Sequence, residues 1–244
     1  MGNVVSITSG KGGTGKTSIT GGVAAWLAQM GKRVLCIDMD IGLRNLDITL
    51  GLNDRALMDF SDVALGRCPL SRAAVEHPEL KGLSLLTAPL TLPASLTADK
   101  VRSLLDTART VYDYILIDSP AGLGSGFRLA VCGADRVIVI ATNDASSLRD
   151  AQRTVCELEG IREVHLIMNR IQTKLLRRLR TTIDDAMNTA GLPLIGVVPE
   201  DPYVILCANL GQPLTVRGRR GASMACWNIA QRLEGRQVPI MRIR

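Results

Sequence analysis

The stretch Gly10-Lys11-Gly12-Gly13-Thr14-Gly15-Lys16-Thr17 decides the fold of this 244-residue chain. It matches the phosphate-binding pattern G-x-x-x-x-G-K-[ST] at every fixed position. Its glycines carry no Cβ and allow positive φ, so backbone N–H groups can converge on the crowded oxygens of a triphosphate. In this pattern Lys16 reaches the β- and γ-phosphates, and the Thr17 hydroxyl ligates Mg²⁺. The stretch therefore predicts a nucleotide-binding loop.

The segments on either side of the loop support the same interpretation. Residues 4–7 are a short apolar run, typical of a buried strand. After the loop, apolar residues recur at helical spacing as far as Met30, and Gly31 ends the helix. Strand, glycine-rich loop and helix thus follow in the order that places phosphate at a helix N-terminus.

The rest of the chain predicts an α/β fold. Hydrophobic residues make up 46% of it and aromatic residues only 3%, as in parallel sheets with aliphatic cores. Apolar runs predict strands at residues 33–38, 83–87, 114–118, 136–141, 164–170 and 194–199. Between them we expect helices at residues 54–65, from Ser71, and at 97–112, 146–159 and 222–233. This alternation predicts a P-loop domain spanning residues 1–244, with a mostly parallel sheet and helices on both faces.

Composition narrows the cellular setting. The sequence shows no signal-peptide pattern and no apolar run of roughly 20 residues. Its six cysteines form no C-x-x-C pair, which favours a reducing cytoplasm. The net charge of +6 and the basic residues at 174–180 have two interpretations, a solvated surface or attraction to anionic lipid or nucleic acid.

Polar residues follow three of the predicted strands. Asp38 is the last residue of the second predicted strand and Asp40 follows it, at the end of the strand where ligands of open α/β sheets bind. Their carboxylates can position Mg²⁺ or water, or they can simply cap a turn. Asp118 ends a later strand and can support the Mg²⁺ shell. Residues 119–122 form either a γ-phosphate-sensing loop or a plain turn. Asn169 can read an adenine edge or serve as a turn residue.

Several of these segments together resemble the deviant Walker A ATPases, the MinD/ParA family of P-loop ATPases. The resemblance rests on Lys11 within the loop, on Asp38-Met-Asp-Ile-Gly-Leu-Arg-Asn-Leu-Asp47, on Asp118-Ser-Pro-Ala-Gly122, on Met168-Asn-Arg170 and on Leu194-Ile-Gly-Val-Val-Pro-Glu-Asp201. It extends from residue 3 to about residue 239. Within the family, the chain is most similar to the MinD group.

The resemblance implies a role for each matching residue. Lys11 reaches across a two-fold interface to the partner's phosphates, as an arginine finger does. Thr17 holds Mg²⁺ with Asp38 and Asp118 behind water, and Asp40 orients the attacking water. The implied catalytic residues are Lys11, Lys16 and Asp40. The implied ATP-binding residues are Gly10, Lys11, Gly12, Gly13, Thr14, Gly15, Lys16, Thr17, Ser18, Asn169, Arg170 and Pro199. Arg44, Asn45, Asp47, Pro120 and Gly122 match the switch and partner-binding segments.

The implied function is an ATP-dependent homodimer that hydrolyses ATP to ADP and phosphate. By resemblance it recruits a division inhibitor (MinC-like), is reset by an activator (MinE-like) and controls septum placement. The alternative is a ParA-like segregation ATPase that binds DNA through Arg177, Arg178, Arg217, Arg219 and Arg220.

The chain departs from the MinD pattern in two places. Thr14 stands where Val is usual, and the sequence shows no amphipathic targeting helix after Pro239. Either the sequence stops short of such a helix, or the protein binds membrane weakly or not at all. We expect a cytoplasmic protein, with peripheral contact to an anionic membrane as the open alternative.

Overall fold

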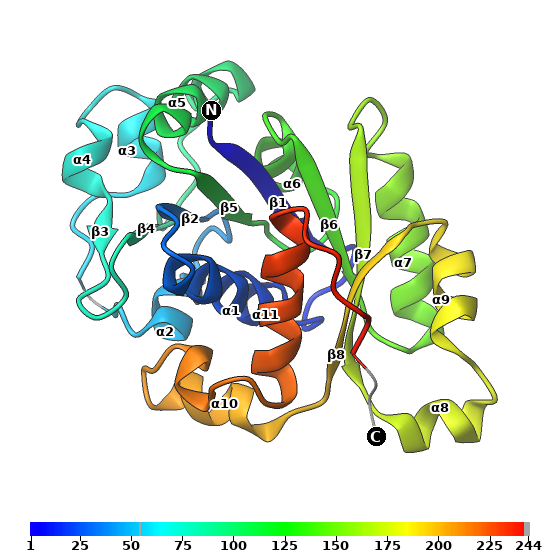
Figure 1. Ribbon diagram of the computed structural model, residues 1–244. Helices are drawn as coiled ribbons and strands as arrows, with labels where there is room; N and C mark the ends of the chain where they lie inside the picture. The colour runs from blue at the N-terminus through cyan, green and yellow to red at the C-terminus, as the bar shows by residue number, and fades with distance from the viewer. Residues whose placement is uncertain (54, 242–244) are drawn as a thin grey trace.

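The computed structural model describes residues 1–53 and 55–241. Its centre is an eight-stranded sheet with the order β3-β4-β2-β5-β1-β6-β7-β8 (Figure 1). β3 pairs antiparallel with β4 at one edge, and the other pairings are parallel. The expected mostly parallel α/β fold is confirmed. The strands are β1 (Asn3–Thr8), β2 (Val34–Asp38), β3 (Val75–Glu76), β4 (Leu83–Leu86), β5 (Tyr114–Asp118), β6 (Arg136–Ala141), β7 (Glu163–Ile171) and β8 (Leu194–Pro199).

Helices cover both faces of this sheet, as expected. No helix in the described chain is both long and apolar enough to cross a membrane. The helices are α1 (Lys16–Gln29), α2 (Leu46–Leu50), α3 (Phe60–Ala64), α4 (Leu70–Ala73), α5 (Ala98–Val111), α6 (Ser125–Val131), α7 (Ala145–Cys156), α8 (Thr173–Leu179), α9 (Ile183–Ala190), α10 (Pro202–Asn209) and α11 (Gly221–Leu233), with a 3₁₀ turn η1 (Leu214–Arg217).

Successive side chains along a strand point to opposite faces of the sheet, so each strand contributes to a hydrophobic core on both faces. Val5 packs into the core beneath α1 and α11, whereas its neighbour Val4 packs toward α5 on the other face. The helices α1 and α11 lie side by side over the sheet (Figure 1). Trp26 and Trp227 join them edge to face, with ring centroids 5.0 Å apart. These contacts fix α1, and with it the loop that precedes it.

The predicted helix at residues 54–65 is wrong in its first half. The helix here, α3, begins only at Phe60, and residue 54 lies outside the described residues. Asp59 explains the late start, because its carboxylate accepts hydrogen bonds from the backbone N–H groups of Ser61 and Asp62. Asp62 completes a capping box, which sets a helix N-terminus at this point.

Other differences concern element ends and short elements. The helix expected at residues 146–159 runs over Ala145–Cys156, and the Asp144 cap explains why it starts one residue earlier than expected. Short elements that the sequence pattern did not predict include α6, α10 and β3. Of these, α10 lies at the functional site, where it begins with Pro202 after the capping residue Asp201.

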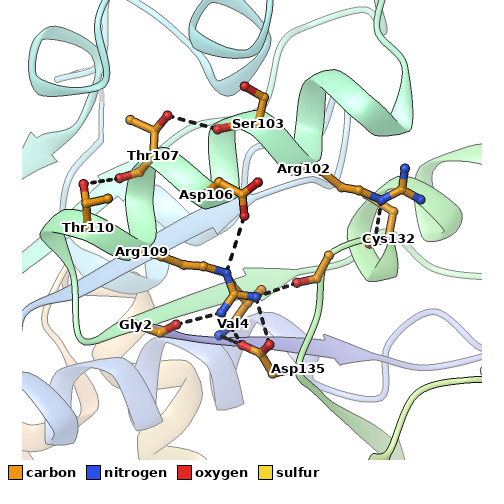
Figure 2. A network of polar contacts seen from close by, with 11 residues as sticks. Gly2, Val4, Arg102, Ser103, Asp106, Thr107, Arg109, Thr110, Cys132 and Asp135 are labelled. Atoms are coloured by element: carbon orange, nitrogen blue, oxygen red, sulfur yellow. Dashed lines mark hydrogen bonds and ion pairs between the residues drawn. The ribbon is translucent and has the colours of Figure 1, made fainter.

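Arg109 ties the start of β1 to the end of α5 and to the turn before β6 (Figure 2). Its guanidinium donates to the carbonyls of Gly2 (2.8 Å) and Gly133 (3.0 Å) and to the Asp135 carboxylate (2.9 Å). The same carboxylate accepts the backbone N–H of Val4 at 2.8 Å. This network anchors the amino end of β1, and the phosphate loop follows the opposite end of the same strand.

Candidate functional site

A cavity of about 550 Å³ lies beyond the carboxyl ends of the central strands. It brings together segments far apart in the sequence: the phosphate loop, the loop after β2, the end of β7 and the β8–α10 connection. Its lining includes Gly12, Gly13, Gly15, Lys16, Thr17, Ser18, Asp40, Asn45, Asn169, Arg170, Pro199, Val204, Ala208 and Leu214. Most of the predicted ATP-binding residues thus meet at one site.

Two glycines of the loop are required for different reasons. Gly15 has a φ of +94°, and a Cβ there would lie 2.3 Å from the amide nitrogen of Asn169. Gly10 has no positive φ, but a Cβ there would lie 2.6 Å from the carbonyl oxygen of Asp150. The next helix begins at Lys16 without a side-chain cap, so its first N–H groups remain available to an anion.

Asn169 and Arg170 brace the loop from behind. The amide of Asn169 donates to the Thr14 carbonyl at 2.7 Å, and Arg170 donates to the Gly13 carbonyl at 3.3 Å. Glu200 holds the Arg170 guanidinium at 3.0 Å. Because the loop carbonyls are turned toward these donors, its N–H groups can face a bound phosphate. The sequence placed Asn169 at the site but did not reveal this contact.

Lys16 is buried, with 7% of its surface exposed. Burial lowers the pKa of Lys16, while the carboxylates of Asp118 and Asp40 act in the opposite direction. Its ammonium donates to the hydroxyl of Ser9 at 3.1 Å. Ser9 belongs to the site although the phosphate-loop pattern does not include it, since it precedes the first position of that pattern by one residue.

Asp38 and Asp118 lie directly opposite each other on the adjacent strands β2 and β5, and both are buried. Burial raises the pKa of Asp38 to about 6, although the N–H groups of Asp40 and Leu46 oppose the shift. Burial, and next the charge of Asp38, raise the pKa of Asp118 to about 7. Two buried carboxyl groups with raised pKa values favour a nearby cation.

The donor set beneath the loop fits Mg²⁺. Among residues 1–53 and 55–241, no three His, Cys, Asp or Glu side chains converge as a metal cluster. Mg²⁺ suits such a site, because it binds through one or two carboxylates, phosphate oxygens and retained waters. Thr17 lines the cavity, and Thr20, one turn further along the same helix, donates its hydroxyl to Asp118 at 3.4 Å. Both oxygens of Asp38 accept backbone N–H groups, at 2.9 and 3.2 Å, so Asp38 fixes the loop after β2.

Asp40 and Pro199 both line the cavity. Asp40 is half-buried, and burial raises its pKa while Lys16 lowers it. Pro199 lines the cavity together with Val204 and Ala208 of α10, which supply apolar surface. The cavity therefore combines charged groups that suit a phosphate with apolar side chains that suit a flat ring.

Lys11 lies outside this cavity. Its ammonium donates to the Ser146 hydroxyl at 2.9 Å and lies 3.4 Å from the Asp144 carboxylate, at the start of α7. Hydrogen bonds from Ser146, Thr142 and the Ser147 N–H, together with Lys11, lower the pKa of Asp144 although burial opposes them. About 44% of the Lys11 side chain is exposed, so it is accessible to a second molecule.

The predicted switch residues lie in two segments that border the cavity: the loop after β2 with the start of α2, and the loop after β5. Arg44 has a φ of +48° and donates from Nε to the Ala88 carbonyl at 2.6 Å. Asn45 lines the cavity, and the Asp47 carboxylate accepts the Ile48 N–H at 2.6 Å. In the second loop, Pro120 packs against Gly126, where a Cβ would lie 2.8 Å from its ring, and Gly122 has a φ of +83°.

Comparisons with known proteins agree with this geometry. A family model described as the CobQ/CobB/MinD/ParA nucleotide binding domain matches residues 5–214. The septum site-determining protein MinD of Helicobacter pylori is 41% identical over 249 residues, which cover 98% of this chain and 92% of that protein.

Solved structures give the same result. The MinC:MinD cell division protein complex of Aquifex aeolicus superposes with a TM-score of 0.91 at 38% identity, covering 98% of both chains. The septum site-determining protein MinD of Pyrococcus horikoshii, solved with Mg-ADP, gives a TM-score of 0.83 at 26% identity, covering 96% of both chains.

Proposed function

Because the chain belongs to the CobQ/CobB/MinD/ParA nucleotide-binding family and, within it, to the septum site-determining MinD proteins, we propose that it is a Mg²⁺-dependent switch ATPase. ATP closes a homodimer, the dimer binds a division inhibitor, and hydrolysis to ADP and phosphate resets it. Through this cycle the protein controls septum placement.

One observation carries the proposal: the phosphate loop, Asp40, Asn169 and Pro199 line a single cavity. The uncapped start of α1 and the Lys16 ammonium supply positive potential for the triphosphate. The apolar wall of Pro199, Val204 and Ala208 suits the adenine ring. When bound, Mg²⁺ would neutralise charge on the β- and γ-phosphates, held by Thr17 with Asp118 and Asp38 behind it.

Asp40 is positioned to act on water at the γ-phosphate. Its carboxylate lines the cavity and interacts electrostatically with Lys16, whereas both oxygens of Asp38 accept backbone N–H groups. A carboxylate at this place can accept a hydrogen bond from the attacking water and orient it.

The place of Lys11 supports dimerisation through the face that carries the loop. It contributes no surface to the nucleotide cavity, and 44% of its side chain is exposed. A cation in this position can serve the phosphates of a second subunit, which would couple hydrolysis to assembly. An inhibitor of the MinC type is the proposed partner, since the Aquifex aeolicus relative was solved in a MinC:MinD complex. An activator of the MinE type is proposed by the same analogy.

An exposed apolar surface supports peripheral contact with anionic lipid. This α10 surface consists of Ile205, Leu206, Leu210 and Val216, with Arg217, Arg219 and Arg220 beside it. Arg217 stacks 3.5 Å from the centroid of the Tyr203 ring, and in the described chain these three arginines form no ion pair. Aliphatic side chains bordered by aromatic rings and arginines suit a membrane interface better than DNA alone.

ATP-dependent sedimentation tests these proposals together. The wild-type protein is mixed with ATP or ADP and with vesicles of anionic or neutral phospholipid, beside a DNA-binding control at two salt concentrations. We expect an ATP-specific dimer by light scattering and sedimentation with the anionic vesicles. A monomer in ATP would contradict the switch, and ATP-dependent DNA binding without vesicle binding would favour the ParA-like alternative.

A further inference from the structure

The hydroxyl of Ser9 contacts both lysine-bearing parts of the phosphate loop. Ser9 follows β1 directly and is only 1% exposed. Its Oγ lies 2.6 Å from the carbonyl oxygen of Lys11 and 3.1 Å from the ammonium nitrogen of Lys16. One small side chain thus joins the first turn of the loop to its phosphate-binding lysine.

The directions of these two hydrogen bonds are fixed by chemistry. An ammonium can only donate, and a carbonyl can only accept. The single hydroxyl proton therefore points to the Lys11 carbonyl, and a lone pair of Ser9 Oγ faces Lys16. The Ser9 side chain makes both hydrogen bonds in a single rotamer, so the two bonds together hold the hydroxyl in place.

Lys16 depends on such a neutral acceptor. A buried ammonium requires hydrogen-bond acceptors, because leaving its donors unsatisfied is costly. Asp118 and Asp40 act on it electrostatically, but in the described part of the chain no carboxylate lies within 4.0 Å of its nitrogen. Held by a hydroxyl, the ammonium can turn to phosphate oxygens without first breaking an ion pair.

We propose that Ser9 is a positioning residue of the nucleotide site, which preorganises Lys16 for the β- and γ-phosphates and anchors the turn that carries Lys11. The inference rests on the proposed nucleotide-binding function. Ser9 acts through these two lysines, so its contribution depends on how many phosphates the ligand carries.

The chain provides a matched control on the same strand. Ser6 is 0% exposed, and its hydroxyl has no hydrogen-bond partner in the structure. Ser6→Ala and Ser9→Ala therefore remove the same buried atom from β1 or its end, but only Ser9→Ala removes contacts to the loop. A general effect of shrinking a buried serine would appear in both variants.

The experiment measures dissociation constants of ATP, ADP and AMP by displacement of a fluorescent nucleotide, below the melting temperature of each variant. We expect Ser9→Ala to weaken ATP and ADP about tenfold, which is typical for a lost hydrogen bond to a charged group. AMP lacks the phosphates that Lys16 contacts, so its affinity should not change. Ser9→Cys keeps a weak acceptor and should give an intermediate loss for ATP, and Ser6→Ala should match the wild type.

Two results would overturn the inference while leaving the proposed function intact. One is normal ATP binding by the wild type with equal affinities in Ser9→Ala and Ser6→Ala. The other is an equal loss for AMP, ADP and ATP in Ser9→Ala, which would indicate general loosening of the fold. A wild-type protein without ATP binding would overturn the proposed function, and this inference with it.

Discussion

The Lys11 ammonium lies 3.4 Å from the Asp144 carboxylate of its own subunit. In the proposed dimer this lysine reaches the partner's phosphates, so the Asp144 contact must break when the dimer closes. Both side chains are nearly half-exposed, and pairs of this kind contribute less than about 1 kcal/mol. The contact is therefore weak enough to be exchanged for a triphosphate.

Asp144→Asn should favour the dimer. The amide removes the negative charge that holds Lys11, yet it still caps α7, because Asn is as good an N-cap as Asp. We expect ATP-dependent dimerisation at about two- to fivefold lower protein concentration, measured by light scattering, with the difference shrinking at high salt. An unchanged midpoint at low salt would show that the contact does not restrain Lys11.

Removing each loop lysine should give a different defect. Lys11→Ala should still bind ATP, because Lys11 lies outside the nucleotide cavity, but it should remain monomeric in ATP. Lys16→Ala should lose ATP binding itself, since its buried ammonium lines the cavity at the start of α1, beside the loop N–H groups. Nucleotide titration and light scattering distinguish the two, and a Lys11→Ala dimer in ATP would contradict the interface role.

The buried acids should make stability fall with rising pH in nucleotide-free, EDTA-treated protein. In the unfolded chain both carboxyl groups titrate near pH 4, whereas burial raises the pKa of Asp38 to about 6 and that of Asp118 to about 7. Between pH 4 and pH 7 the unfolded state is therefore ionised while the folded state keeps its protons, so unfolding becomes easier as pH rises.

Urea denaturation at pH 5 and pH 8 measures this effect. The wild type should lose on the order of a few kcal/mol between these values from the buried pair. Asp118→Asn should lose clearly less, because it cannot ionise, and Mg²⁺ with nucleotide should stabilise the wild type most at pH 8. Equal pH profiles for the wild type and Asp118→Asn would contradict the raised pKa.

Gly15→Ala should impair nucleotide binding, because it meets two obstacles. The backbone φ of +94° disfavours an L side chain by roughly 1–2 kcal/mol, and the new Cβ would displace the Asn169 amide that braces Thr14. We expect roughly tenfold or weaker ATP affinity, measured by fluorescent-nucleotide titration. Gly31→Ala is the control, since its φ is +83° but nothing lies within 4 Å of the Cβ position. A similar loss of affinity in both variants would argue against the role of the Asn169 brace.

The parts of the site with fixed spacing could be predicted from the sequence. The loop, Asp38 and Asp118 follow apolar runs that could only be buried strands, and the parallel sheet brings their carboxyl ends together. The bracing contacts could not be predicted, because the partners of Asn169 and Ser9 include backbone carbonyls of the loop, and their positions depend on its path.

Two helix predictions were wrong because the hydrophobic periodicity and the N-capping residues gave different indications. The apolar spacing of residues 54–65 indicated one helix, but the Asp59 cap delays its start to Phe60. The helix α10 was missed for the opposite reason. The segment 203–206 is continuously apolar, so its hydrophobic residues show no helical period. The signal for a helix here is the preceding Asp201-Pro202 pair, in which Asp201 is the N-cap and Pro202 the first helical residue.

Arg109→Ala should lower stability without changing nucleotide affinity. Only 15% of the Arg109 side chain is exposed, and its loss would leave the carbonyls of Gly2 and Gly133 without their donor (Figure 2). We expect a loss of about 2 kcal/mol in the free energy of unfolding, measured by urea denaturation. Arg109→Lys should not restore it, because a single ammonium cannot reproduce the fork of donors.

Arg102 is the matched control in the same network. It lies on the same helix and donates to the Cys132 carbonyl at 3.0 Å, but half of its side chain is exposed (Figure 2). Arg102→Ala should therefore cost less than about 1 kcal/mol. The Arg109 network closes the amino end of β1, and the phosphate loop follows its carboxyl end, so ATP affinity should stay at the wild-type value in both variants. Weaker ATP binding in folded Arg109→Ala alone would mean that β1 transmits the change along its length to Ser9 and the loop.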